Sequence, residues 1–149
     1  MASRLGRGYA RLLRFGDDMA AERPLVAVVD DDKSLRNATR DLLRAAGFSA
    51  AAFEDAESFL GSPSRASAAC LVADMRMPGM SGLDLHQALV ASGDEIPSVL
   101  VTAWPEPSTL SRARAAGMAC CLAKPFAPDD LIDCVRAALA TRRSPIAKA

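Results

Sequence analysis

Short apolar runs alternate with segments of helical periodicity along most of this chain, and this alternation limits the folds that it can adopt. The runs that we predict to be strands cover residues 25–29, 48–53, 69–74, 97–102 and 118–123. The predicted helices cover residues 33–46, 54–60, 82–91, 108–116 and 128–141. Successive strands joined through helices are parallel, and a parallel sheet needs helices on both faces. We therefore expect a doubly wound α/β fold with a five-stranded parallel sheet in the order 2-1-3-4-5 and five helices.

The predicted elements make one domain over residues 24–141, a length that suits a single hydrophobic core. Residues 1–23 differ from this domain, because arginines recur there at steps of three and four with leucines between them. This basic extension is either disordered or an amphipathic helix that meets a partner or an anionic surface. Residues 142–149 form a short polar tail.

The charge balance and the cysteines narrow the classes of protein to consider. The 18 Lys and Arg residues balance 18 Asp and Glu residues, so no net charge draws the chain to nucleic acid or membranes. No apolar run approaches the roughly 18 residues that would span a bilayer. The four cysteines, Cys70, Cys120, Cys121 and Cys134, fit no zinc-binding spacing. We interpret them as small core residues in a reducing cytosol.

Polar side chains stand where several predicted strands end. They are Asp30 and Asp31 after the first strand, Asp74 at the end of the third, Thr102 at the end of the fourth and Lys124 after the fifth. The carboxyl ends of parallel strands share one edge of the sheet, and the expected order places the first and third strands side by side. The three carboxylates therefore converge, and they repel one another unless a cation neutralises them. An all-oxygen site of this kind suits Mg²⁺.

The residue types at this edge favour one kind of chemistry. The set has no base paired with a nucleophile for hydrolysis, and the chain has no Gly-rich loop to hold a nucleotide. It suits a carboxylate that accepts a phosphoryl group while a metal ion and Lys124 neutralise the charge that builds up. Taken alone, Asp74 is equally consistent with a carboxylate that caps the following turn.

These residues resemble, in their order and spacing, the receiver domain of response regulators in bacterial two-component signalling. The motifs that carry the resemblance are Val28-Val29-Asp30-Asp31, Asp74 with Met77-Pro78-Gly79 after it, Thr102-Ala103, and Lys124-Pro125-Phe126. The segment from Ala52 to Leu60 is most similar to the FixJ-type branch of that family. The resemblance covers residues 24–141 and implies the flavodoxin-like receiver fold.

The resemblance also implies a role for each of these residues. Asp74 would be the phosphoacceptor that takes a phosphoryl group from the phosphohistidine of a histidine kinase. The implied ligands of Mg²⁺ are Asp30, Asp31, Asp74 and the backbone carbonyl of Arg76. Thr102 would hydrogen-bond a phosphoryl oxygen, and Lys124 would pair with the phosphoryl group from a cis Lys124–Pro125 bond.

Two positions depart from the family pattern or stand out within it. Cys121 lies three residues before Lys124, where the family usually has a Tyr or Phe that turns inward when the threonine moves. A thiol cannot make that ring movement, so the usual coupling to Thr102 is not expected. Trp104, the only tryptophan, lies two residues beyond Thr102, at a position that tunes phosphoryl loss in the family. Its indole either shields the phosphoryl group from water or contacts a partner.

We therefore expect a phosphorylation-activated switch and not a metabolic enzyme, since the chain would catalyse only its own phosphorylation and dephosphorylation. Its partners would be a sensor histidine kinase or a phosphotransferase in the cytoplasm. The surface that the kinase reads would include four residues of the first helix, Leu35, Arg36, Thr39 and Arg40. The family's usual dimer surface corresponds to residues 108–116, 118–123 and the last helix. The charged pairs expected across a two-fold axis there are Arg112 or Arg114 with Asp129, Asp130 or Asp133.

Other interpretations remain open. No helix-turn-helix follows the last helix, so we expect no direct nucleic-acid binding by this chain. The first alternative is the receiver portion of a longer FixJ-type transcription regulator, with Arg142 opening a linker. A remote alternative is a phosphohydrolase with an aspartyl-phosphate intermediate, but such enzymes usually place a second Asp where this chain has Arg76. His86 is interpreted as a surface or half-buried residue and not as a phosphocarrier.

Overall fold

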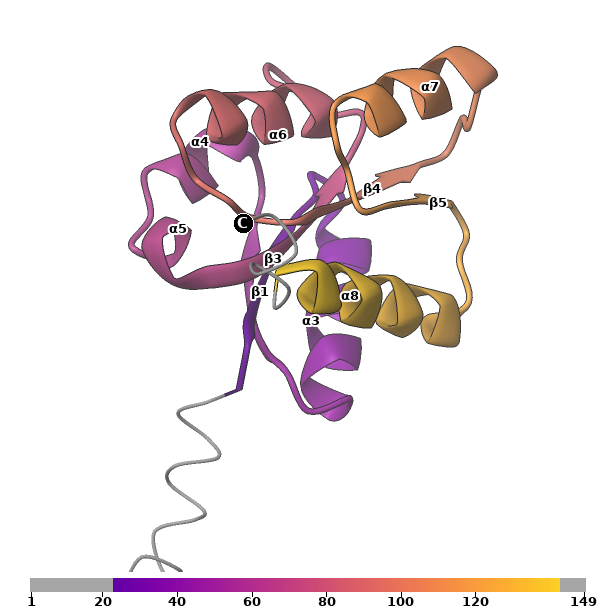
Figure 1. Ribbon diagram of the computed structural model, residues 1–149. Coiled ribbons are helices and arrows are strands. Elements are labelled where there is room, and N and C mark those ends of the chain that lie inside the picture. The colour runs from indigo at the N-terminus through magenta and orange to yellow at the C-terminus, as the bar shows by residue number, and fades with distance from the viewer. Residues whose placement is uncertain (1–22, 143–149) are drawn as a thin grey trace, which may run out of the picture.

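The computed structural model describes residues 23–142, and its strands and helices alternate as the sequence predicts (Figure 1). In chain order they are β1 (Leu25–Val29), α3 (Lys33–Ala45), β2 (Ser49–Phe53), α4 (Ala56–Leu60), α5 (Ser64–Ser67), β3 (Ala68–Asp74), α6 (Gly82–Ala91), β4 (Ser98–Thr102), α7 (Pro107–Ala115), β5 (Cys120–Ala123) and α8 (Pro128–Arg142). The predictions about the basic extension and the polar tail concern residues that lie almost entirely outside this range. None of the helices within it is both long and apolar enough to cross a membrane.

The five strands form one parallel sheet in the order β2-β1-β3-β4-β5, which confirms the predicted fold class. The order reverses between β1 and β3, which pair over the register from Val26–Cys70 to Val29–Ala73. The central strands are apolar on both faces because helices cover both sides, and every residue of β4 is buried. The edge strand β5 is only half-buried.

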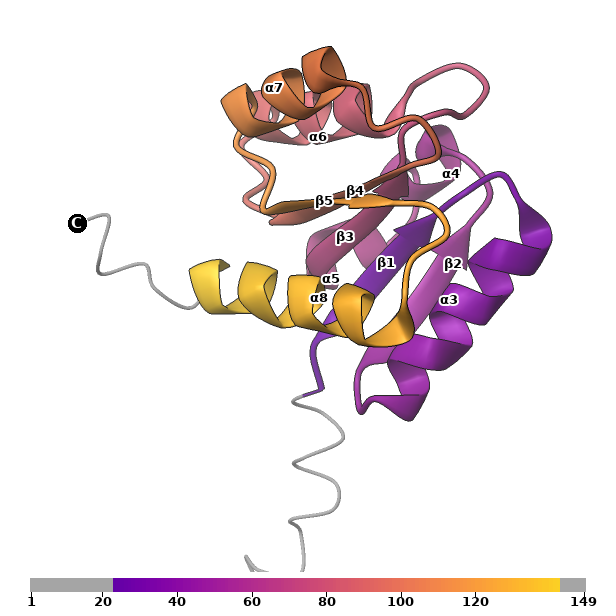
Figure 2. The same ribbon diagram turned by 90° about the vertical axis from the view of Figure 1, so that its right-hand side faces the viewer.

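Two helical layers enclose the sheet (Figure 2). Helices α3 and α8 pack on one face, where Leu43, Leu131 and Val135 join the side chains that β1, β3 and β4 direct to that side. The opposite face packs against α4 and α6 through Phe59, Leu85 and other apolar residues, and α7 lies beside α6 on this side. Side chains that alternate along each strand therefore serve two separate cores.

Local capping chemistry sets the starts of the helices that frame the carboxyl edge. The Asp32 carboxylate accepts a hydrogen bond from the Leu35 N–H at the start of α3. Ser81 and Asp84 form a reciprocal capping box at the start of α6. These caps fix where the loops that follow β1 and β3 end.

Two sequence predictions differ from the structure. Helix α5 is a sixth helix within the described range, where five were predicted, and it lies between the predicted helix 54–60 and the predicted strand 69–74. Arg65 in this turn pairs with Asp94, a partner far along the chain that no local pattern reveals (2.8 Å from Nη2 to Oδ2). His86 is buried and not at the surface, and its ring nitrogens lie 2.9 Å from Ser98 Oγ and from the Ala116 carbonyl oxygen.

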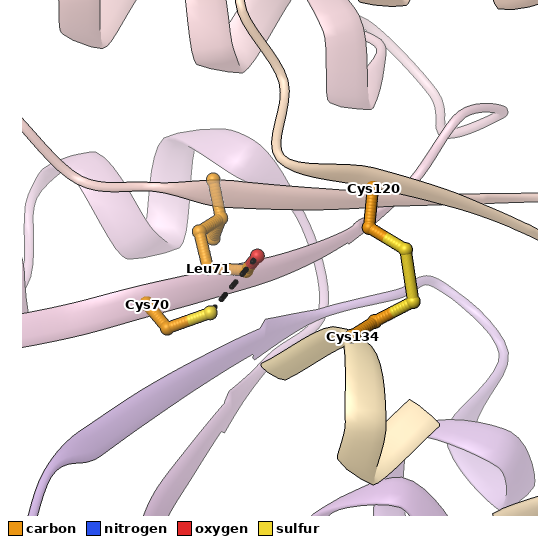
Figure 3. Close-up of a disulfide and its surroundings, with 4 residues drawn as sticks. All are labelled: Cys70, Leu71, Cys120 and Cys134. Atoms are coloured by element: carbon orange, nitrogen blue, oxygen red, sulfur yellow. Dashed lines mark hydrogen bonds between the residues drawn. A yellow bond between two sulfur atoms is a disulfide. The ribbon is translucent and has the colours of Figure 1, made fainter. Parts of the chain in front are cut away.

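The interpretation of all four cysteines as separate core thiols is wrong for one pair. Cys120 at the start of β5 and Cys134 in α8 form a disulfide, with their Cα atoms 5.9 Å apart (Figure 3). Their separation of 14 residues hides this contact, because only the packing of α8 on the sheet brings them together. Cys70 and Cys121 are free, and Cys70 is buried as expected.

Candidate functional site

Three carboxylates meet at the carboxyl edge of the sheet, where β1 and β3 lie side by side. Asp30 and Asp31 follow β1 and Asp74 ends β3, and one oxygen of each lies within 4.8 Å of the others. Asp30 and Asp74 are only 6% and 7% exposed, whereas Asp31 faces solvent. Carboxylates this close and this buried need a positive partner.

Lys124 supplies that positive charge from the loop after β5. Its Nζ lies 3.3 Å from Asp30 Oδ2 and 3.2 Å from Asp74 Oδ1, so one ammonium bridges both buried carboxylates. The Lys124 N–H also donates to the Thr102 carbonyl, which ties this loop to the end of β4. The Lys124–Pro125 peptide bond is cis, as predicted.

Burial and neighbouring charges shift the pKa values of the central pair. Burial raises the pKa of the Asp74 carboxyl, and the charge of Asp30 raises it further, against the opposing effect of Lys124. Burial alone lowers the pKa of the Lys124 ammonium, but the carboxylates of Asp30 and Asp74 outweigh it and raise that pKa overall. Lys124 is therefore firmly charged, while Asp74 carries a charge that a further cation would stabilise.

Backbone contacts hold Asp30 in place. Its Oδ1 accepts a hydrogen bond from the Asp32 N–H (2.9 Å), and its carbonyl accepts one from Arg36 Nη1 (2.8 Å). Arg36 thus supports the acidic site, a role that the sequence analysis missed when it assigned this residue to a kinase-reading surface. Thr39, assigned to the same surface, is buried. The sequence position of Arg36, one turn into the helix that follows Asp30 and Asp31, could have indicated this supporting role.

The backbone of Asp74 is held as closely. The Met75 N–H donates to the Val101 carbonyl, so pairing with β4 continues past the acid. Gly82, the first residue of α6, lies against it, and a Cβ on Gly82 would stand 2.5 Å from the Asp74 carbonyl oxygen. Only glycine allows this approach.

The side chain of Thr102 contacts the backbone of Trp104. Thr102 is buried, and its Oγ1 accepts a hydrogen bond from the Trp104 N–H (3.1 Å). The indole of Trp104 is 60% exposed, near the strand ends but not packed into the core. Cys121 is half-buried on β5, in register with Leu100, and burial raises the pKa of its thiol.

A shallow depression opens beside the acids, and its lining residues are Asp31, Met75, Arg76, Met77, Pro78 and Ser81. It gives solvent access to the one exposed carboxylate of the cluster. The donor atoms gathered here are oxygens, with room for water, and hard divalent cations with several retained waters favour such sites. The residues present therefore fit Mg²⁺.

The face made by α7, β5 and α8 carries opposite charges on different helices. Arg112 and Arg114 of α7 are exposed, as are Asp129, Asp130 and Asp133 of α8. None of these five forms an ion pair with another residue in the described part of the chain. Their charges are available to a partner.

Comparisons with known proteins agree with this geometry. A family model for the response regulator receiver domain matches residues 26–136. Response regulator protein TodT of Pseudomonas putida is 33% identical over 121 residues, which are 81% of this chain and 53% of TodT. Transcriptional regulatory protein FixJ of Bradyrhizobium diazoefficiens is 32% identical over 114 residues, 76% of this chain and 56% of FixJ. The chain thus spans about half the length of these relatives.

A solved structure of the response regulator StyR has the same fold. It aligns with a TM-score of 0.75 and 43% identity, over 85% of this chain and 65% of the StyR chain.

Proposed function

This chain belongs to the response regulator receiver family, and from this premise we propose that it is a switch activated by phosphorylation of Asp74. The observation that carries the proposal is the position of Lys124 Nζ between Asp30 and Asp74, within a cluster of three carboxylates. A structural ion pair needs one carboxylate for one lysine. A second buried carboxylate leaves one negative charge in excess. Such an excess suits a site in which one carboxylate is the nucleophile and the remaining negative charge binds a metal ion.

The phosphoryl donor in this proposal is the phosphohistidine of a sensor histidine kinase or a phosphotransferase. An Asp74 carboxylate oxygen forms the new bond to phosphorus as the phosphorus–nitrogen bond breaks. The imidazole leaves with the electron pair of that bond and takes up a proton. Asp74 must be ionised to attack, so the opposing effect of Lys124 on its raised pKa favours the reaction.

Mg²⁺ bound at this site would neutralise negative charge on the phosphoryl oxygens during transfer. Asp30, Asp31 and Asp74 would hold it, together with the backbone carbonyl of Arg76. The support for this placement is that one oxygen of each of the three carboxylates already lies within 4.8 Å of the others.

Lys124 and Thr102 act on the phosphorylated form in this proposal. Once Asp74 carries a phosphoryl group, Lys124 can pair with a phosphoryl oxygen from its present position 3.2 Å from the acid. Thr102 still has its hydroxyl proton to donate, because its oxygen is the acceptor in the contact with the Trp104 N–H. A shift of Thr102 toward the phosphoryl group would move the Trp104 backbone with it. The cytoplasm is the location that this function implies.

Intact mass spectrometry tests the proposal. The full chain is incubated with acetyl phosphate and Mg²⁺, and we expect a gain of one phosphoryl group that EDTA prevents. Asp74→Ala should lose the adduct, whereas Asp133→Ala, which removes an exposed carboxylate, should keep it. An adduct that survives in Asp74→Ala, or none in the wild type, would contradict the assignment.

A second candidate, also regulatory, is that this chain is the receiver part of a longer transcription regulator. The printed name of FixJ, a transcriptional regulatory protein, and the half-length match to it support this candidate. An antibody raised against the chain would show on a blot of the native cells whether the protein runs at this mass or at about twice it. A phosphohydrolase is disfavoured because Arg76 occupies the place of the second acid.

We also propose that two phosphorylated copies associate through the face made by α7, β5 and α8. The support is the unpaired basic and acidic side chains that this face exposes on its two helices. Sedimentation with and without acetyl phosphate should show a dimer only when phosphorylated, and Arg112→Glu should prevent it. A monomer under both conditions would rule this surface out.

A further inference from the structure

A second pocket opens at the amino edge of the sheet, the edge opposite Asp74. It has a volume of about 530 Å³ and lies where β4 and β5 begin and where α6 and α7 end. Its lining includes His86, Val90, Asp94, Glu95, Pro97 and Thr141. We call it the amino-edge pocket.

The walls of the amino-edge pocket combine an apolar part and an acidic part. Val90 is 58% exposed, and the half-buried Pro97 and the buried Ile96 complete the apolar part of the lining. Asp94 is paired with Arg65 through a single oxygen, Oδ2, and its Oδ1 accepts no hydrogen bond from the residues that the structure describes. Glu95 is exposed and makes no ion pair with any described residue. The pocket therefore suits a segment that has an apolar side chain and positive charge.

We propose that the amino-edge pocket binds residues 143–149 of the same chain. Thr141 in the last turn of α8 lines the pocket, so this segment begins at its rim. The segment has one large apolar residue, Ile146, and two cations, Arg143 and Lys148. Ile146 is the fifth residue after Thr141, so it can reach at most about 18 Å from it. This reach is enough to place Ile146 against Val90. Arg143 and Lys148 would then lie near Asp94 and Glu95.

The short connection also makes a weak contact sufficient. A segment tethered at the rim of its own site has an effective concentration in the millimolar range. The basic residues 1–22 also match the acidic rim in charge, but they enter the fold at β1, two strands away from β4. Proximity therefore favours residues 143–149. The contact would fix the direction in which the chain leaves α8, and it does not depend on phosphorylation of Asp74.

His86 offers a direct probe of the contact, because it is the only histidine and lies in the wall of the pocket. Its ring signals in a proton–carbon NMR spectrum need no further assignment. We expect a chain that stops at Arg142 to show shifted His86 signals at the same pH. A synthetic peptide of residues 141–149 should move them back in a saturable manner.

Two substitutions define the contact. The peptide with Ile146→Ser should bind about tenfold more weakly, because one apolar side chain no longer leaves water. The control peptide with Ala147→Ser should bind as the original does. Val90→Asp in the shortened chain should abolish binding, and since Val90 is exposed its fold, checked by circular dichroism, should persist.

Three results would overturn the proposal. His86 signals that are identical with and without residues 143–149 would show that the segment does not bind there. Signals that move only when residues 1–22 are deleted would assign the pocket to that segment. Signals that change with protein concentration would assign it to a second copy.

Discussion

The ammonium of Lys124 lies between two buried carboxylates, 3.2 Å from Asp74 Oδ1 and 3.3 Å from Asp30 Oδ2. The sequence analysis gave the neutralisation of these acids chiefly to a metal ion. In the structure the lysine supplies part of this neutralisation, since its ammonium contacts both buried carboxylates. One cation for two buried anions leaves an imbalance, and several measurable properties depend on it.

Replacement of Lys124 by Met should destabilise the protein. Two buried carboxylates would lose their only cationic partner within the described residues, at a cost of roughly 1–3 kcal/mol for partly solvated groups. Urea unfolding in EDTA at neutral pH measures the change, and added Mg²⁺ should restore part of it. Lys33→Met, at an exposed lysine without an ion pair, should have almost no effect. A variant as stable as the wild type in EDTA would mean that the bridge is energetically neutral.

Asp74→Asn should stabilise the protein at neutral pH. The pKa of Asp74 is raised in the folded state, so the folded chain holds this proton more tightly than the unfolded chain does. The contribution of Asp74 to stability is therefore greatest at low pH and falls as pH rises from the ordinary pKa of 3.8 toward the raised one. Asn cannot ionise and avoids that loss.

The stabilisation by Asp74→Asn should consequently shrink between about pH 7 and about pH 4, where the wild-type carboxyl becomes protonated. Urea midpoints across this range, without Mg²⁺, measure it. Glu54→Gln, at an exposed carboxylate, is the control and should show no such trend. A gain for Asp74→Asn that grows toward acid pH would contradict the direction of the pKa shift.

The fold and the meeting of the strand-end residues could be predicted because both follow from a single rule. Parallel strands end at a common edge, so a residue's position at a strand end places it in space without knowledge of packing. Asp30, Asp74 and Lys124 lie far apart in sequence, yet each is fixed by its own strand. The strand order was predicted from the five strand–helix repeats.

The features that were missed depend on how distant elements pack. Gly82 is special only because the first turn of α6 lies against the Asp74 carbonyl. His86 is buried because α6 covers the start of β4, where Ser98 meets its ring. The pairing of Cys120 with Cys134 requires α8 to cross the start of β5. Sequence periodicity predicts which face of an element is buried but not which residue lies opposite it.

Gly82→Ala should destabilise the protein by about 1–3 kcal/mol, the usual range for a side chain forced into a packed site. The new Cβ would lie 2.5 Å from the Asp74 carbonyl oxygen and 3.0 Å from Leu100 Cδ1, so α6 must move away from the site. Gly61→Ala is the matched control, because its Cβ would meet only the Glu57 carbonyl, at an ordinary 3.5 Å. Thermal unfolding of both variants separates the two cases, and equal stability would contradict the close approach.

The Cys120–Cys134 disulfide determines how many cysteines can be alkylated before and after reduction. Protein purified without reductant and alkylated after unfolding should label two cysteines, Cys70 and Cys121, and four after reduction. Cys134→Ser should lower the free energy of unfolding by up to about 3 kcal/mol, the cost of opening a loop of this length. Reductant should weaken the wild type and leave the variant unchanged. Four labelled thiols without reduction would show that the bond is absent in solution.

Trp104→Ala should shorten the lifetime of the phosphorylated form. The Trp104 N–H is bound to Thr102 Oγ1, so the indole is attached within two residues of the side chain that we propose contacts the phosphoryl group. A large ring there would exclude water from the phosphorus, and alanine would admit it. The exposed state of the indole, 60%, means that its removal leaves no cavity, so stability should change little.

The decay of the phosphoryl adduct, followed by intact mass after removal of acetyl phosphate, measures the lifetime of this form. A several-fold faster loss in Trp104→Ala is the expected result, and Leu110→Ala, at another exposed apolar side chain on α7, should decay like the wild type. Trp104→Phe should retain most of the protection if ring size is the cause. An unchanged lifetime in Trp104→Ala would instead favour a partner surface for the indole, because the side chain is 60% exposed.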